Sequence, residues 1–156
     1  MNVIWAPWRA DYITQPRDSS CILCTAPKNG DPLILKKGHE CYAIMNRFPY
    51  TAGHTLVAPY RHVGDLTELR IEEVSEIMSL VINIMSATRK AMNPAGFNVG
   101  CNIGAVAGAG IADHFHMHIV PRWNGDTNFM PVLSDIHIIS EHIQKIRDKI
   151  AENLNS

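Results

Sequence analysis

Residues 114–120 read His114-Phe-His-Met-His-Ile-Val120, and this alternation of imidazole and apolar side chains predicts the strand that decides the fold. Successive side chains of a strand point to opposite faces, so one face would carry three histidines and the other three apolar groups. A core does not need clustered imidazoles, which are costly to bury without partners. The pattern therefore favours metal ligands or a nucleophilic histidine over a solvated strand without chemistry.

The loop before this strand is rich in glycine and alanine, and runs Gly100-Cys-Asn-Ile-Gly-Ala-Val-Ala-Gly-Ala-Gly110. Glycines let the backbone approach a ligand closely, and exposed N–H groups in such turns can form a nest for an anion. In isolation the loop would be interpreted as a plain connection between strands. Its position directly before the histidines favours anion binding.

The flanking sequence predicts an α+β domain built on an antiparallel sheet, with one long central helix and a C-terminal helix. Strand-like runs occur at 40–46, 54–59, 97–103 and 114–120, and helical spacing occurs at 67–92 and 138–154. Asn93-Pro94 is expected to end the long helix. We divide the single predicted domain, residues 1–156, into an N-terminal segment (1–38), a core (39–134) and the C-terminal helix (135–156).

Composition excludes several classes of protein. The 156 residues are 46% hydrophobic and 19% charged, with a formal net charge of -1, so no basic surface for nucleic acid is indicated. The N-terminus lacks the pattern of a signal peptide, and no apolar run reaches the roughly 18 residues that span a bilayer. We expect a cytoplasmic protein with neither nucleic-acid nor membrane partners, whose four cysteines are not paired in structural disulfides.

The histidine stretch matches the signature of the histidine triad (HIT) family at every position, and the resemblance covers nearly the whole chain. The segment from Tyr42 to His62 resembles the nucleotide-binding hairpin of that family. Residues 121–129 and 5–9 are similar to a bacterial branch described as diadenosine tetraphosphate phosphorylase-like. The resemblance implies the HIT-like α+β fold and a homodimer.

The same resemblance implies a covalent mechanism centred on His116. This residue would attack the α-phosphorus of an adenine nucleotide and form a nucleotidyl-histidine, while the carbonyl of His114 fixes its tautomer. His118 would bind a phosphate or leaving-group oxygen. The implied substrate-binding residues are Asn46 for the ribose and Asn102, Gly108 and Gly110 for the phosphate oxygens.

The resemblance leaves the reaction open. The leading interpretation is phosphorolysis or hydrolysis of dinucleoside polyphosphates. Alternatives are a nucleoside phosphoramidate hydrolase and a nucleotide-binding regulatory protein with weak catalysis. Many relatives carry a Gln or Ser with a hydroxyl-bearing neighbour shortly before the first histidine, whereas residues 108–112 here offer no side-chain donor. This departure puts substrate preference in doubt, but not the nucleophile.

Cys21-Ile-Leu-Cys24 has the spacing of one half of a zinc site, although two ordinary thiols in a turn would have the same spacing. Zinc-binding relatives complete such a pair with two histidines, which the resemblance carries onto His62 and His114. The resulting Cys₂His₂ set would be closed and structural. The remaining assignments are surface positions for His39, His137 and His142, burial in strands for Cys41 and Cys101, and core or interface roles for Trp5, Trp8 and Trp123.

Overall fold

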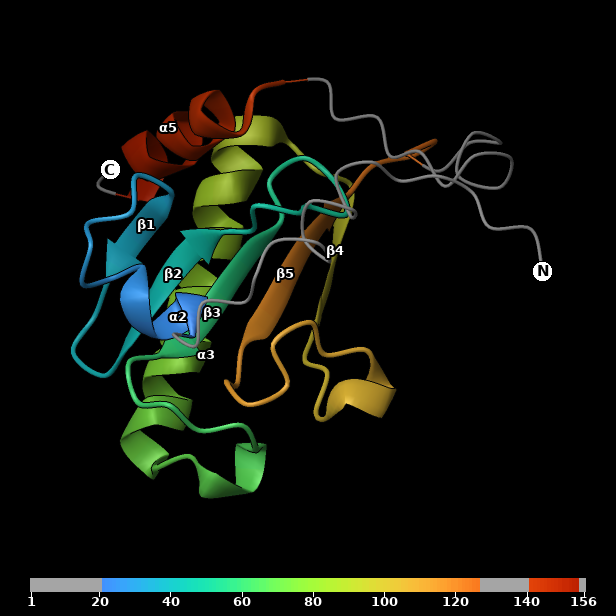
Figure 1. Ribbon diagram of the computed structural model, residues 1–156. Coiled ribbons are helices and arrows are strands. Elements are labelled where there is room, and N and C mark those ends of the chain that lie inside the picture. The colour runs from blue at the N-terminus through green and yellow to red at the C-terminus, as the bar shows by residue number, and fades with distance from the viewer. Residues whose placement is uncertain (1–20, 127–140, 155–156) are drawn as a thin grey trace.

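The fold is built on one five-stranded antiparallel sheet, which the computed structural model describes together with its helices over residues 21–126 and 141–154 (Figure 1). The strand order is β1-β2-β3-β5-β4. The strands are β1 (Ile34–Lys37), β2 (Cys41–Met45), β3 (Thr55–Pro59), β4 (Gly96–Gly100) and β5 (Met117–Arg122). The predicted α+β class with an antiparallel sheet is confirmed.

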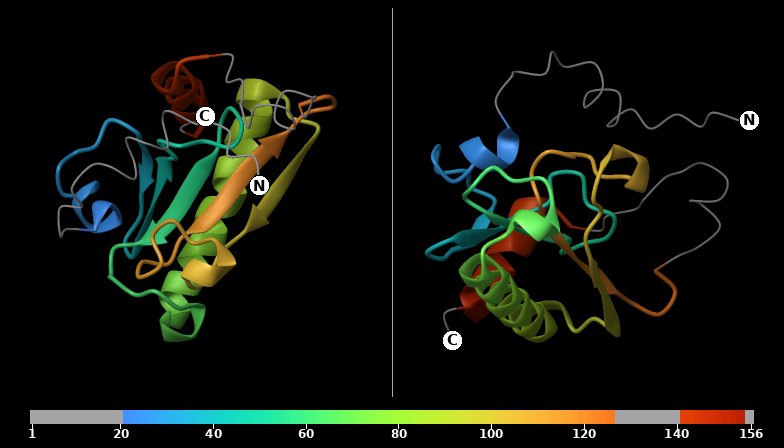
Figure 2. Two further views of the ribbon diagram at one scale, coloured as in Figure 1. Left: turned by 45° about the vertical axis from the view of Figure 1, so that its right-hand side comes forward. Right: turned by 90° about the horizontal axis from the view of Figure 1, so that it is seen from below.

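Two helices cover one face of this sheet (Figure 2). Helix α3 (Ile71–Met92) packs against β2, β3 and β5, and α5 (Ile143–Leu154) packs against α3 and β1. The short helix α2 (Ile22–Thr25) lies on the opposite side, in front of β2 and β3 in Figure 1. None of the described helices has both the length and the apolar composition needed to cross a bilayer.

Helix α3 begins later than its apolar spacing predicts. Residues Leu66–Glu68 form a 3-10 turn, and Arg70 is extended before the first helical turn. The carboxylate of Glu73 accepts the backbone N–H of Arg70 at 2.8 Å, which satisfies a donor that the helix start would otherwise leave unpaired. At the other end Asn93 adopts the left-handed conformation with φ of 48°, so the predicted stop is confirmed.

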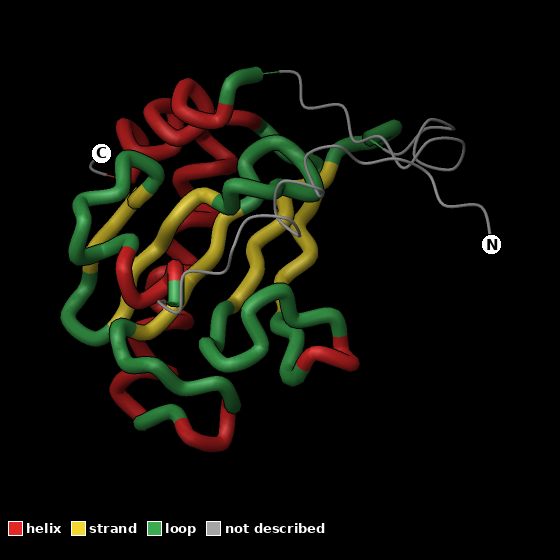
Figure 3. Tube along the Cα trace, in the orientation of Figure 1, coloured by secondary structure: helices red, strands yellow, loops and turns green. Residues whose placement is uncertain are grey.

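Strand β5 also differs from its prediction, because it starts at Met117 rather than at His114. Figure 3 shows the sheet strands and the loops that connect them. The N–H of Phe115 donates to the carbonyl of Val63 at 2.6 Å, outside the sheet, and the ladder with β3 begins only at Met117. The three histidines are therefore not three positions of one strand. Two precede it, and only His118 lies within it.

Other boundaries shift by similar local effects. Strand β4 ends at Gly100, so Cys101 lies beyond it and is half-buried, whereas Cys41 is fully buried in β2. Strand β1 and α2 were not predicted, and β1 pairs with β2, so the core extends into the segment assigned to 1–38. Trp123 is half-buried and caps α3, since its Nε1–H donates to the Met92 carbonyl at 3.3 Å. Trp5, Trp8, His137 and the predicted helical residues 138–140 lie outside the described residues.

Candidate active site and metal centre

Two chain segments bring five histidines together. Pairing of β3 with β5 places Leu56 opposite His118, and the hydrogen bond from Phe115 to Val63 extends the contact beyond the strand ends. The first segment contributes His54 and His62. The second contributes the histidines at 114, 116 and 118. The five imidazoles divide into a catalytic candidate and a metal-binding candidate.

His116 has a tautomer that its backbone neighbour fixes. Its Nδ1 lies 2.8 Å from the His114 carbonyl oxygen, which can only accept, so Nδ1 carries the proton and Nε2 carries a lone pair. The side chain is 4% exposed, and burial lowers the pKa of the imidazole, an effect that the hydrogen bond to His114 opposes. His116 is therefore neutral at pH 7, with an unprotonated nitrogen.

The tautomer of His118 is set by His54, a residue for which no role was predicted. The backbone N–H of Tyr50 donates to His54 Nδ1 at 3.0 Å, and the amide of Asn46 donates to the same atom at 3.3 Å. The proton of neutral His54 is therefore on Nε2, which lies 2.9 Å from His118 Nδ1. His118 must accept there, so its own proton is on Nε2.

The proton on His118 Nε2 has no acceptor among the described residues, although the atom is buried. Its ring lies 4.9 Å from that of His116, centroid to centroid. Burial lowers the pKa of His118 to about 4, and burial together with the two neighbouring imidazoles lowers that of His54 to about 3. The site thus offers a neutral nucleophile beside a buried hydrogen-bond donor.

A signal for His54 was present in the sequence. Gly53, with φ of 81°, closes the turn between β2 and β3, and the histidine that follows lies directly before the mostly apolar strand β3. A fully buried imidazole at such a place needs partners, which only the fold reveals.

The predicted substrate-binding residues are engaged within their own loops. Asn46 accepts the N–H of Phe48 through Oδ1 at 3.0 Å while its amide nitrogen contacts His54, so both halves of its amide are used. The amide nitrogen of Asn102 donates to the carbonyl of Gly108 at 3.3 Å, which folds the glycine loop back on itself. Gly108 and Gly110 are exposed. Their phosphate-binding role stays a prediction.

The second cluster gathers the four residues predicted as metal ligands, Cys21, Cys24, His62 and His114, with one potential ligand atom of each within 4.8 Å of all the others. His114 Nδ1 lies 3.3 Å from Cys21 Sγ, 3.4 Å from Cys24 Sγ and 3.3 Å from His62 Nδ1. Bonds of about 2.0–2.3 Å to a central zinc correspond to tetrahedral edges of about 3.3–3.8 Å. The cluster therefore has the dimensions of a Cys₂His₂ site.

His114 is oriented for ligation by its other nitrogen. Its Nε2 lies 2.9 Å from the Pro59 carbonyl oxygen, so the proton is there and Nδ1 presents a lone pair to the cluster. Burial lowers the pKa of this imidazole, which favours the neutral form that binds a metal. His114 thus contributes its side chain to the metal centre, and only its carbonyl touches the catalytic candidate.

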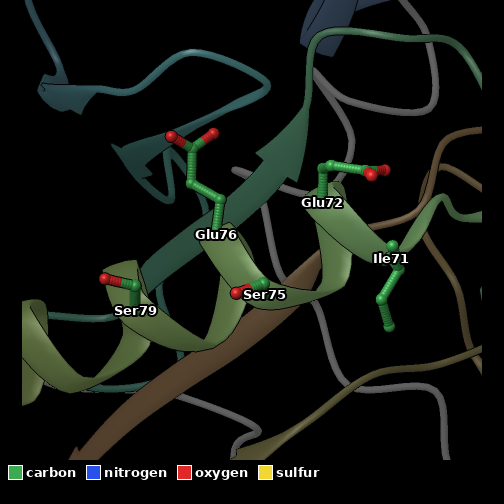
Figure 4. Close-up of a pocket in the computed structure, with 5 residues that line it drawn as sticks. All are labelled: Ile71, Glu72, Ser75, Glu76 and Ser79. Atoms are coloured by element: carbon green, nitrogen blue, oxygen red, sulfur yellow. The ribbon is translucent and has the colours of Figure 1, made fainter.

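A hollow elsewhere on the molecule offers no comparable chemistry (Figure 4). It is lined by Ile71, Glu72, Ser75, Glu76 and Ser79 of α3. The carboxylate of Glu76 is already committed to the backbone N–H groups of residues 39–41. The histidine clusters are therefore the candidate site.

Comparison with known proteins agrees with this geometry. A family model described as HIT domain matches residues 28–125. An AP-4-A phosphorylase from Mycobacterium tuberculosis is 33% identical over 95% of this chain and 82% of its own length. The adenosine 5'-monophosphoramidase hnt1 of Schizosaccharomyces pombe is 29% identical over 86% of this chain and 98% of its own.

A solved structure has the same fold. The crystal structure of a Zn-bound histidine triad family protein from Mycobacterium smegmatis superposes with a TM-score of 0.72 and 28% identity, over 88% of this chain and 94% of that one. The matched relatives include proteins named for enzymatic activities. The chain belongs to the HIT family, as the histidine stretch predicted.

Proposed function

We propose that this protein is a nucleotide-processing enzyme that cleaves dinucleoside polyphosphates, of the diadenosine tetraphosphate kind, through a nucleotidyl-His116 intermediate. The observation that carries the proposal is the pairing of a lone pair on His116 Nε2 with a buried, unpartnered donor on His118 Nε2. The AP-4-A phosphorylase relative supports the choice of substrate.

In the first step His116 displaces the leaving nucleotide from the α-phosphorus. The lone pair of His116 Nε2 forms a bond to the α-phosphorus, and the bond from that phosphorus to its bridging oxygen breaks. His118 Nε2–H donates to the departing oxygen, and the proton that His54 holds against His118 Nδ1 keeps the donor oriented. The products are a nucleotidyl-histidine and the leaving nucleotide.

In the second step water or inorganic phosphate attacks the same phosphorus and releases His116. Hydrolysis gives a nucleoside monophosphate, and phosphorolysis gives a nucleoside diphosphate. The N–H groups of residues 107–109 donate to carbonyls within the loop. Those of residues 104–106, in a turn shaped by the positive-φ glycines Gly104 and Gly108, would stabilise the negative oxygens.

Product analysis of diadenosine tetraphosphate cleavage, with and without inorganic phosphate, tests the proposal. ADP plus ATP formed only with phosphate identifies a phosphorylase, and AMP plus ATP in both conditions identifies a hydrolase. His116→Ala should lower turnover by about 10³-fold or more, because it removes the nucleophile. Unchanged turnover in this variant, or no product from the wild type, contradicts the proposal.

A nucleoside phosphoramidate is the second candidate substrate, favoured by the relative named as a phosphoramidase. The chemistry at His116 would be the same, with an amine as leaving group. The lack of a side-chain donor in residues 108–112 weighs against this substrate. A regulatory protein with weak catalysis would bind nucleotide equally well with alanine at position 116, which direct binding measurements would reveal.

We further propose that the Cys₂His₂ cluster holds a structural zinc ion, supported by its dimensions and by the Zn-bound neighbour. Zinc would tie the segment at Cys21 to the loop at His62 and to His114, two residues before the nucleophile. Metal analysis of the purified protein, with about one zinc per chain as the expected result, tests this.

A homodimer would use β4, which lies at one edge of the described sheet. Val99 of this strand and Ile82 of α3 are exposed, and the guanidinium of Arg89 over the Phe97 ring joins α3 to β4. The opposite edge strand carries two exposed lysines and is covered by Arg147 at the Ile34 carbonyl. Exposed lysines disfavour pairing of a second copy along the β1 edge, and β4 carries no such charges. A second copy would therefore pair along β4. Sedimentation of wild type and Val99→Lys tests this, with a monomeric variant expected.

A further inference from the structure

We propose that Asp113 is a positioning residue for the metal centre, whose carboxylate faces His62 Nε2 at 3.6 Å and by electrostatic attraction holds that imidazole with Nδ1 toward the cluster. This inference rests on the proposed zinc site. His62 Nδ1 lies 3.3 Å from Cys24 Sγ and 3.3 Å from His114 Nδ1, so this nitrogen is the one turned to the metal. The ring proton of a ligating His62 is then on Nε2.

The two histidines of the cluster differ in what supports them. His114 is fully buried, and a backbone carbonyl receives its outer N–H. The side chain of His62 is 46% exposed, and the group beside its Nε2 among the described residues is the carboxylate of Asp113, with 3.6 Å between Nε2 and Oδ2. Ligating histidines are held by such outer partners, and carboxylates are common among them.

Backbone packing places this carboxylate beside His62. The loop at Gly64 runs so close to residues 112–113 that a Cβ at Gly64 would lie 3.0 Å from the Ala112 carbonyl oxygen and 3.1 Å from Asp113 Cα. The hydrogen bond from Phe115 to Val63 holds the same two segments together. Asp113 is therefore fixed next to His62 by the backbone, although the two residues are far apart in the chain.

The carboxylate has no evident packing role. Its side chain is 77% exposed, so replacement by the isosteric amide opens no cavity. A loss on substitution would therefore report on the metal centre and not on the core.

The test challenges zinc-loaded wild type, Asp113→Asn and Asp113→Glu with a chromophoric zinc chelator, with Asp148→Asn as a control that removes the same charge from α5. We expect Asp113→Asn to bind zinc about tenfold more weakly, at the lower end of the range for outer partners because the carboxylate is exposed. Asp113→Glu should recover most of the affinity, and Asp148→Asn should match the wild type. Thermal unfolding of the metal-free proteins should not distinguish Asp113→Asn from the wild type.

Equal zinc affinity in Asp113→Asn and the wild type overturns the inference while leaving the zinc site in place. An equal loss in Asp148→Asn also overturns it, since the effect would then be general charge. A wild type that retains no zinc overturns the zinc proposal and this one together. None of these readouts depends on turnover, so the failure of the enzymatic proposal is separate.

Discussion

The two imidazole pairs of this site have similar separations and opposite geometry. His62 and His114 approach through Nδ1 atoms 3.3 Å apart, with two cysteine sulfurs converging on the same point. His54 Nε2 and His118 Nδ1 lie 2.9 Å apart in a hydrogen-bonded chain. The N–H of Tyr50 fixes the tautomer of His54, and His54 fixes that of His118. The ligand atoms of the first cluster converge on one point and are suited to a cation. In the second pair each lone pair accepts an N–H, so protons alone complete the hydrogen bonds. The neighbours of an imidazole, and not its residue type, therefore decide which one is suited to bind a metal.

The largest expected effect comes from breaking the converging cluster. Cys24→Ser should weaken zinc binding by more than about 100-fold, because losing a ligand costs more than losing an outer partner. Turnover should also fall, since the proposed metal would hold the ring of His114, whose carbonyl orients His116. Zinc content and single-turnover rates check both effects. Cys41→Ser, at a buried thiol outside the cluster, is the matched control, and full zinc retention in Cys24→Ser would rule out the site.

Breaking the proton chain should have a smaller effect. His54→Asn removes the donor to His118 Nδ1, so His118 can adopt the other tautomer and lose its proton on Nε2. We expect kcat to fall about 10- to 100-fold, part of what a positioned acid contributes, with zinc content unchanged. Steady-state kinetics separates kcat from KM. A variant with wild-type kcat would show that the chain does not orient the donor.

Acid should affect the chain through the same neutral imidazoles. The pKa of His118 is about 4 and that of His54 about 3 when folded, against 6.5 ordinarily, so the unfolded chain takes up protons first. Folding stability should therefore decline as pH falls below about 6.5 and level off only below the folded values. Urea unfolding between pH 7 and 5 measures the slope, and His118→Gln should flatten it. An equal slope in wild type and variant would contradict the assignment.

Asn46 provides the smallest test. Both halves of its amide are bonded within the loop, so Asn46→Ala should cost about 1 kcal/mol of stability. If Asn46 acts only within the loop, KM should change by less than about threefold. A tenfold rise in KM would support the ribose role that the family resemblance implies, which stays a prediction. Denaturant unfolding and steady-state kinetics together separate the two effects.

The elements that local periodicity controls were predicted best from the sequence. Helix α3 and its stop at Asn93-Pro94 followed from spacing and from a residue that tolerates the left-handed conformation. Strand ends were predicted worst. Strand β5 begins at Met117 because its pairing with Val57 of β3 begins there, and this pairing depends on the tertiary structure. Strand β1 was missed because four residues carry too little pattern to identify a strand.

The sequence by itself determined the family, the fold class and the three histidines, since these depend on residue types at fixed spacing. Through the family resemblance, the sequence also predicted the four residues of the Cys₂His₂ cluster. Only the tertiary structure decided which nitrogen of each ring carries a proton. A tautomer depends on the group that faces each nitrogen, and for His118 that group is His54, 64 residues earlier in the chain and brought into contact by strand register.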